Sequence, residues 1–502
     1  MPTDYNGIAP RVGFAYDTTG KGKFVVRGGF GIFFDAVNAN VIGVGQPFHY
    51  IFSYTGPPGG GSVPLATFGV DANGNPNGTV LQIPVGYNPQ HPEFIKPYSI
   101  FYPDANFRTP YVQAINFGFQ YHVPHAGVLD TNYVGKLARK LTIPLDLNPA
   151  IYDCSGGAYA ADPTRYCTNA SNSSTSEQAR VRYAPFNYGG QGIVDILSVG
   201  TSNYNALQVQ YTQRGGRYLT VFGSYTYSRA LDWQTNGQTT ANSVPDVFNL
   251  NSDYGPSDSN AKHNLTMGWV TRFPKVTGGN VIVRSVLNNW IYSGQYLAHT
   301  GTPINVTQNG DQALDGEPNQ RAALVPGIPL TLPSNRHRSD KVAEWFNREA
   351  FTYAAVGTFS TLSRNALTGP AYIMTNMTVG RDFPLASLRE GMRLNIRGEA
   401  YNVFNTPNLA NPNAAFSCST TNVEGGYSPT QPTPGAKYYP GVSCDSTEMP
   451  NNAGAGTGSF NGLVNVNGQN VIRFGRVLST AGNNGNTSTN GRKMQFALTL
   501  FF

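Results

Sequence analysis

The sequence ends on Arg492-Lys493-Met494-Gln495-Phe496-Ala497-Leu498-Thr499-Leu500-Phe501-Phe502, in which apolar and polar side chains alternate. Successive side chains of a β-strand point to opposite faces, so the apolar ones share a face: Met494, Phe496, Leu498, Leu500 and Phe502. About eleven residues at ~3.3 Å each, tilted by ~40°, rise about 27 Å, close to the apolar band of a transmembrane barrel. The stretch predicts a membrane strand, although soluble sheets also alternate.

The composition favours many strands joined by long connections. Only 12% of the residues are charged and 40% are hydrophobic, with 57 glycines and 35 prolines. No run of about 18 apolar residues occurs, which excludes helical membrane spans, so a membrane protein with this sequence would be a β-barrel. The net charge of +6 is spread thinly, without blocks of Lys and Arg, so nucleic acid is not an expected partner.

Ten further segments alternate in the same way and form five predicted hairpins. They are residues 8–17 with 24–34, 107–123 with 128–136, 203–214 with 219–229, 263–273 with about 286–298, and 373–383 with 392–404. The hairpin turns are short, as at Arg214-Gly215-Gly216-Arg217, where glycine permits positive φ. Between hairpins lie long stretches rich in Gly, Pro, Asn and Ser: 36–105, 140–202, 231–260, 304–370 and 405–491.

This alternation of short turns with long loops predicts an all-β fold, an antiparallel transmembrane β-barrel with short periplasmic turns and long extracellular loops. With the terminal strand there are eleven strands, and the first and last both run from outside to the periplasm. Bacterial single-chain barrels have even strand numbers, so eleven strands fit the C-terminal portion of a 22-stranded barrel. Residues 471–478 are assigned to the last loop, because another strand would break the alternation.

Several segments in order resemble the TonB-dependent outer-membrane transporters, and among them the Oar-like receptors. The resemblance covers most of the chain. The segments are APRVGFAYD (9–17), RGGFG (27–31), NYNALQV (203–209), SYTYSRALD (224–232), GEAYNVFN (398–405) and the terminal aromatic residue. The resemblance implies a 22-stranded barrel with an N-terminal plug that the inner-membrane TonB complex opens.

Compared with that 22-stranded barrel and its plug, residues 1–502 are expected to be the C-terminal part of the barrel. The sequence shows no signal peptide, carboxypeptidase-regulatory-like domain, plug or TonB box, so no residue is assigned to energy coupling. The family's terminal aromatic resembles the signal read by the barrel-assembly machinery, which implies this role for Phe502, supported by Phe496, Leu498 and Leu500. The alternative is an aromatic side chain that only anchors the strand at the membrane interface.

The four cysteines form two local pairs, each within a long loop. Cys154 with Cys167 and Cys418 with Cys444 predict two loop-stapling disulfides. A zinc site would require closer Cys-x-x-Cys spacing and nearby histidines.

No sequence motif points to an enzyme or to a cofactor. Asp311, Asp315 and Glu317 surround a glycine and are a weak calcium candidate, against a solvated acidic turn; otherwise no metal site is expected. His263 and His299 lie near strand ends, where hydrogen bonding is the expected role. The inward Arg393, Arg397 and Glu399 could line a substrate path or bind one another.

Aromatic residues also gather in two of the predicted loops. Exposed rings there could bind sugars or peptides, but packing of the loops onto themselves is favoured. These residues are Trp345, Phe346 and Phe351 in one loop, and Tyr50, Tyr54, Tyr98, Phe101 and Tyr102 in another.

The sequence therefore predicts a receptor or transporter that moves a scarce solute across the outer membrane of a Gram-negative bacterium. Expected partners are outer-membrane lipid, the barrel-assembly machinery, the TonB complex through a region outside this sequence, and a solute that the sequence does not identify. Two alternatives stay open: a passive porin or surface adhesion barrel, and a secreted soluble all-β binding module.

Overall fold

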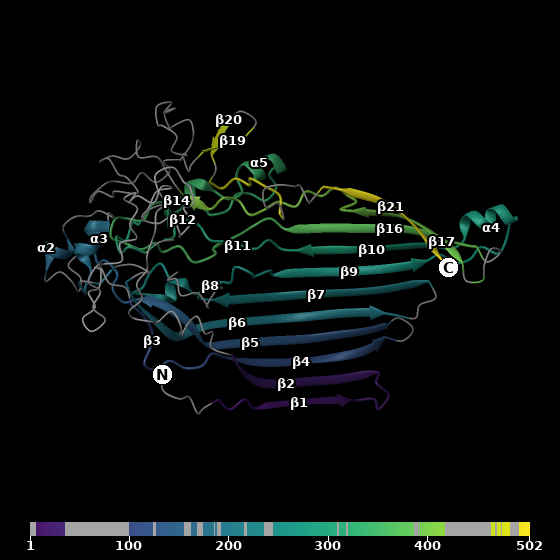
Figure 1. Ribbon diagram of the computed structural model, residues 1–502, viewed down its shortest axis with the longest axis horizontal. Coiled ribbons are helices and arrows are strands. Elements are labelled where there is room, and N and C mark those ends of the chain that lie inside the picture. Colours follow the sequence, from purple (N-terminus) through teal and green to yellow (C-terminus); the bar gives the residue numbers. More distant parts are fainter. Residues whose placement is uncertain are drawn as a thin grey trace, which may run out of the picture.

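The chain folds around one large antiparallel sheet (Figure 1). The computed structural model describes residues 7–35, 100–123, 127–154, 162–167, 174–184, 186–187, 192–214, 218–234, 244–308, 311–317, 320–385, 390, 392–416, 463–466, 469–472, 474–481 and 491–502. Eleven long strands of the sheet lie side by side in chain order: β1 Arg11–Asp17, β2 Phe24–Phe34, β4 Tyr111–Val123, β5 Gly127–Asp146, β6 Ile193–Gln213, β7 Leu219–Asp232, β9 His263–Arg272, β10 Trp290–His299, β16 Tyr372–Pro384, β17 Arg393–Tyr401 and β21 Lys493–Phe501.

These are the eleven strands that the alternating segments predict, in the predicted order. Each long strand pairs antiparallel with the next, so β1 and β21 run in the same direction and form the two edges of the sheet. β1, β4, β6, β9 and β16, which shorter connections follow, end at one end of the sheet, whereas β2, β5, β7, β10 and β17, which longer connections follow, end at the other (Figure 1). The sheet is open between β1 and β21, and the predicted total of 22 strands stays a prediction.

Several strand boundaries differ from the prediction, and those of β5, β6 and β10 change the connections. β5 and β6 continue well into the predicted loop 140–202, where the short strand β3, Ile100–Pro103, pairs parallel with β6. β10 begins at Trp290, because the apolar residues before it form the helix α4, Val281–Leu287. The Asn280 side chain caps this helix by accepting a hydrogen bond from the Val283 N–H at 2.9 Å.

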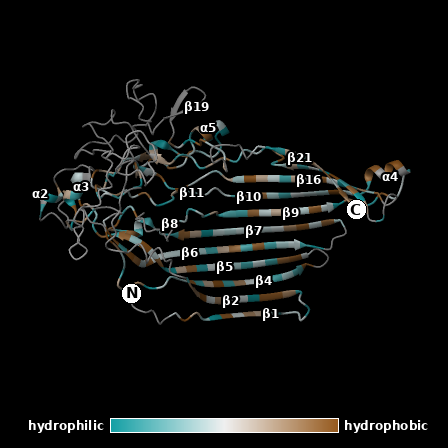
Figure 2. Cartoon of the chain, viewed as in Figure 1, coloured by the Kyte–Doolittle hydropathy of each residue, from teal (hydrophilic) through white to brown (hydrophobic). Residues whose placement is uncertain are grey.

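The strand register sorts side chains into an apolar face and a polar face. In an antiparallel pair, directly opposed residues lie on the same face. Leu394 opposes Leu500 and Ile396 opposes Leu498, whereas Asn395 opposes Thr499. The same register continues to the other edge of the sheet, where Phe30 opposes Val12 and Ile115. Hydrophobic and hydrophilic residues therefore alternate along the strands, as Figure 2 shows.

The long connections contain most of the molecule's buried apolar residues. Small strand pairs organise them: β7 with β8 (Gly255–Pro256), β11 (Pro303–Ile304) with β15 (Leu367–Thr368), β12 (Thr307–Gln308) with β18 (Ala415–Phe416), β13 (Ala323–Leu324) with β14 (Phe351–Thr352), and β19 (Leu463–Val466) with β20 (Gln469–Ile472). Short helices accompany them: α2 Pro163–Tyr166, α3 Ser174–Arg180, α5 Arg338–Ala343, and the 3-10 turns η3 Leu250–Asp253 and η4 Arg348–Ala350.

The described part of residues 471–478 lies outside the large sheet. Its first two residues end β20, and Phe474 bridges to Asn413. This agrees with the assignment of that stretch to the last loop. In the described ranges, no helix has the length and hydropathy needed to cross a membrane.

Candidate functional site: the polar face of the sheet and the loop cluster

At the β17–β21 edge, polar side chains of the sheet bind one another. Arg397 Nε lies 2.8 Å from Glu399 Oε1, and the hydroxyl of Tyr401 donates to Glu399 Oε2 at 2.9 Å. Gln495 on β21 also donates to Glu399. Arg393 places its guanidinium over the Phe501 ring, 4.4 Å from the centroid. Of the three charged residues considered, Arg397 and Glu399 therefore bind one another, whereas Arg393 stacks on Phe501.

A second polar group lies towards the other edge of the sheet. Arg27 on β2 approaches Asp130 on β5 to 3.7 Å and donates to Gln120 on β4, which lies between them. Asn132 donates to Asp130 from the same face. Gly118 makes room for this group, because a Cβ there would lie 2.1 Å from Asn132 Oδ1. Together the two groups place hydrogen-bond donors and acceptors on this face of the sheet.

The loop cluster, comprising the described residues of 304–370 with 408–416 and 474–481, has its own apolar core. Phe346, Phe351 and Phe474 meet edge to face, with ring centroids 5.1–5.7 Å apart. Phe346 is only 1% exposed. Trp345 packs against this core and donates its indole N–H to the Thr368 carbonyl at 2.9 Å. These aromatics pack their loop onto itself and onto the last loop, which agrees with the packing role favoured from the sequence.

Buried ion pairs attach the loop cluster to the connection between β7 and β9. Arg321 pairs with Asp253, and Arg364 pairs with both Asp232 and Asp258, the latter at 2.9 Å. Except for Asp258, these side chains are less than a tenth exposed. Sequence reasoning missed them, because the partners are separated by 68 to 132 positions and belong to no local motif.

The calcium candidate residues lie in a tight, buried turn. The Asp311 carboxylate accepts hydrogen bonds from the backbone N–H groups of Leu314 and Gly316, each at 2.7 Å. It also accepts one from the side-chain amide of Gln320, at 2.6 Å. Burial, followed by the charges of Asp311 and Glu317, raises the pKa of Asp315 well above its usual range. Among the described residues, no three His, Cys, Asp or Glu side chains converge as a metal site. The carboxylate of Asp311 organises the turn, and the calcium candidate stays a prediction.

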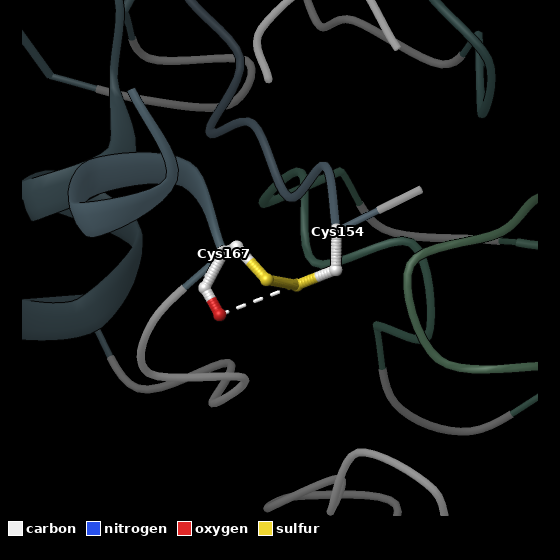
Figure 3. The surroundings of a disulfide bond; sticks show 2 residues. All are labelled: Cys154 and Cys167. Atoms are coloured by element: carbon white, nitrogen blue, oxygen red, sulfur yellow. Dashed lines mark hydrogen bonds between the residues drawn. A yellow bond between two sulfur atoms is a disulfide. The ribbon is translucent and has the colours of Figure 1, made fainter. Parts of the chain in front are cut away.

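Of the two predicted disulfides, one lies among the described residues. Cys154 and Cys167 are bonded, with their Cα atoms 4.7 Å apart, and close a loop that includes α2 (Figure 3). Cys154 Sγ also lies 3.2 Å from the Cys167 carbonyl. Cys418 and Cys444 lie outside the described residues.

The two histidines near strand ends make hydrogen bonds, as predicted. His263 Nδ1 lies 2.8 Å from the Tyr225 hydroxyl, and His299 Nδ1 lies 2.8 Å from the Thr300 carbonyl. His299 also stacks on Tyr372, with centroids 5.2 Å apart.

The second predicted aromatic group is only partly described. Phe101 and Tyr102 lie on β3, which pairs with the start of β6, whereas Tyr50, Tyr54 and Tyr98 lie outside the described residues. Beside β3, Asp195 is buried near Asp104. Burial and then the Asp104 charge raise the pKa of Asp195 to about 6.

The residues predicted to form an assembly signal lie on the apolar face of the last strand and just after it. Phe496, Leu498 and Phe502 are 87, 69 and 79% exposed, and Leu500 is 38% exposed. Burying such side chains in a hydrocarbon environment is favourable by roughly 25 cal/mol per Å² of apolar surface. Burial in hydrocarbon is favourable in the same way for the exposed apolar side chains on this face of the other strands.

Residues 1–432 match the family described as "Outer membrane beta barrel domain". The chain belongs to this family. This outer-membrane barrel resides in the outer membrane of a Gram-negative bacterium, so its apolar face contacts lipid and its polar face lines the lumen. The turn end of the sheet is periplasmic, and the loop cluster is extracellular. A comparison with curated proteins found no match.

Among solved structures, the barrel is similar to the outer membrane transporter YddB from Escherichia coli, with a TM-score of 0.38 and 8% identity over 82% of this chain and 38% of that one. It is also similar to the ferric-catecholate import receptor Fiu from E. coli K12, with a TM-score of 0.32 and 8% identity over 81% of this chain and 31% of that one. For the FrpB iron transporter from Neisseria meningitidis, the TM-score is 0.33 and the identity 9%, over 80% of this chain and 35% of that one. The chain thus spans less than two fifths of the length of these proteins.

Proposed function

We propose that the chain is the C-terminal part, about eleven strands, of a 22-stranded, TonB-dependent transporter of the Oar-like type. In this proposal residues 1–502 supply about half of the wall and much of the extracellular surface. A signal peptide, a carboxypeptidase-regulatory-like domain and a plug precede them in the whole protein. The transporter carries a scarce solute across the outer membrane and performs no covalent chemistry.

The observation that carries this proposal is the direction of the two edge strands. Because β1 and β21 run the same way, pairing them with each other would be parallel, whereas every long-strand pair in the sheet is antiparallel. An odd number of additional strands restores antiparallel pairing at both edges, and eleven more give 22. The order of the sequence segments that resemble TonB-dependent transporters favours the same number.

The polar lumen face and the extracellular loop cluster support solute binding. Networks such as Arg397–Glu399–Gln495 offer hydrogen-bonding groups that a polar solute can use. The packed core of the loop cluster and its buried ion pairs hold the outer surface in a defined shape, which selective binding requires. A passive pore would need neither the packed loop core nor the buried ion pairs.

The test starts with the DNA upstream of Met1. We expect the reading frame to continue through a plug and a TonB box to a signal peptide; a stop codon with none of these would contradict the proposal. Cells with the whole gene or a deletion are then grown with limiting siderophore-bound iron, oligosaccharide or peptide, with and without a functional TonB complex. We expect one solute to require both the gene and TonB. Growth that needs the gene alone would instead indicate a passive pore.

We further propose that Phe502, with Phe496, Leu498 and Leu500, is read by the barrel-assembly machinery. Phe496, Leu498 and Leu500 lie on the lipid face of edge strand β21, and Phe502 follows the strand and is 79% exposed, so an assembly factor can reach all four. Deleting Phe502 from the whole protein should lower its amount in the outer membrane several-fold. Phe501→Ala is the control, because Phe501 lies on the lumen face. If the parent and both variants reach the outer membrane in equal amounts, the proposal is contradicted, and Phe502 is only an anchor at the membrane interface.

A further inference from the structure

A pocket of about 340 Å³ opens at the extracellular end of β2 and β4. We call its lining residues Ile32, Phe34 and Tyr111 the floor and Arg108, Thr109 and Lys140 the rim; Ile8 and Gln113 complete the lining. The register places the three floor residues on the lipid face of the sheet. The pocket therefore faces the membrane rather than the lumen, so a solute moving through the barrel would not reach it.

The floor of the pocket is apolar and aromatic. The rings of Phe34 and Tyr111 lie 5.8 Å apart across the β2–β4 pair, and Ile32 continues the same face towards the membrane. Aromatic residues at this level are typical of the interface between hydrocarbon and headgroups in outer-membrane barrels. This surface suits the upper part of an acyl chain.

The rim of the pocket is cationic. Arg108 and Lys140 are both exposed, and the residues that line the pocket include no carboxylate. Two cations beside an apolar floor complement an anionic group attached to acyl chains. Guanidinium and ammonium groups both bind phosphate oxygens well.

The backbone at Lys140 forms a β-bulge with a positive φ. Lys140 is an extra residue in β5: Arg139 pairs with Thr201 and Leu141 pairs with Gly200, which leaves Lys140 out of the ladder. Its φ of 58° lies in the left-handed region, which a lysine seldom adopts. β-Bulges of this kind redirect a side chain, and strained backbone concentrates at functional positions. Here the bulge brings Lys140 to the rim of the pocket.

We propose that this pocket binds the phosphorylated headgroup of an acylated lipid in the outer leaflet. Arg108 and Lys140 contact phosphate, the Thr109 hydroxyl contributes a hydrogen bond, and the acyl chains lie along Phe34, Tyr111 and Ile32. The proposal rests on the membrane location of the barrel and not on transport. Its test uses no transported solute, so either proposal can fail without the other.

The test compares two double variants of the barrel as it is assembled in outer membranes and extracted into maltoside micelles. Arg108→Gln with Lys140→Gln removes both rim charges. Lys21→Gln with Lys23→Gln removes the same charge from the turn before β2, at the opposite end of that strand. Native mass spectrometry then measures binding of diphosphoryl lipid A, monophosphoryl lipid A and inorganic phosphate. Far-UV circular dichroism and the gel shift on heating verify folding, and Lys140→Gln alone replaces the first variant if it does not fold.

We expect the parent and the Lys21/Lys23 variant to bind diphosphoryl lipid A equally. The Arg108/Lys140 variant should bind it about tenfold more weakly or worse, since one charge-assisted contact contributes roughly a decade of affinity. Monophosphoryl lipid A should bind more weakly than the diphosphoryl form to the parent. Equal binding by all variants would overturn the proposal, and so would displacement of the lipid by equimolar inorganic phosphate, which would indicate a free-anion site.

Discussion

The sheet and the loop cluster of this barrel contain the same kinds of apolar residues. The sheet exposes these residues, whereas the loop cluster buries them. Phe496 on the sheet is 87% exposed, whereas Phe346 in the loop cluster is 1% exposed. The sheet leaves its apolar side chains for lipid to cover. The loop cluster buries its own, together with ion pairs such as Arg364–Asp232, as a soluble domain does.

This difference determines what holds each region together. The sheet relies on a continuous ladder of backbone hydrogen bonds and on the membrane, so one side chain contributes mainly through its depth and face. The loop cluster relies on side chains that interlock, so a single truncation leaves a cavity. The effect of a mutation on stability should therefore depend on depth and face in the sheet, and on the cavity it leaves in the loop cluster.

The largest effect is expected from truncation in the core of the loop cluster. Phe346→Ala removes a ring that contacts both Phe351 and Phe474, and such truncations cost about 3–5 kcal/mol. Phe248→Ala, at a loop ring that is 58% exposed, is the control and should cost far less. Hydrogen exchange should show faster opening of residues 320–370 in the first variant, with the protection of β4 to β9 unchanged. Faster exchange throughout the sheet would mean that the two regions unfold together.

The same contrast explains how much of the molecule the sequence predicts. The eleven strands and their faces follow from alternation alone, since the period of two persists across each membrane segment. Leu207, Val209 and Tyr211 share a face in the structure as they do in the pattern. Alternation fails at Val281–Leu287, where apolar residues at helical spacing with a capping Asn280 form α4 instead of the predicted start of β10.

The loop cluster was predicted only as loops, and its internal order depends on distant partners. Arg321 and Asp253 lie 68 positions apart, and nothing in the local sequence joins them. The tendency of Phe346 and Phe351 to pack inward was expected, but Phe474 belongs to a connection more than a hundred residues later. The cationic pocket was also missed, because the bulge that places Lys140 at its rim leaves no signature in the alternation.

A second prediction compares the two faces of one strand. Met267 and Thr266 are neighbours on β9, with Met267 on the lipid face and Thr266 on the lumen face. Met267→Arg should reduce the free energy of unfolding by about 2–4 kcal/mol, because arginine near the bilayer midplane is poorly solvated. Thr266→Arg should change it by less than about 1 kcal/mol, since the lumen is wet. Urea unfolding in phospholipid vesicles measures both, and equal losses would contradict the assignment of the faces.

The smallest effect is expected at the loop end of the sheet, at the pairing of β3 with the start of β6. Burial and the Asp104 charge raise the pKa of Asp195 from its usual 3.8 to about 6, so folding disfavours its charged form. Below about 3.8 the carboxyl is protonated whether this segment is folded or open, and the pairing has its full stability. Between the two pKa values the open form loses its proton first, so stability falls as the pH rises, and above about 6 it levels off. Hydrogen exchange of residues 193–197 at several pH values, corrected for the intrinsic exchange rate, should thus show more opening at about pH 8 than at about pH 5. In Asp195→Asn the difference should largely disappear, because no charge remains to be buried. A pH dependence that persists unchanged in this variant would place the titrating group elsewhere.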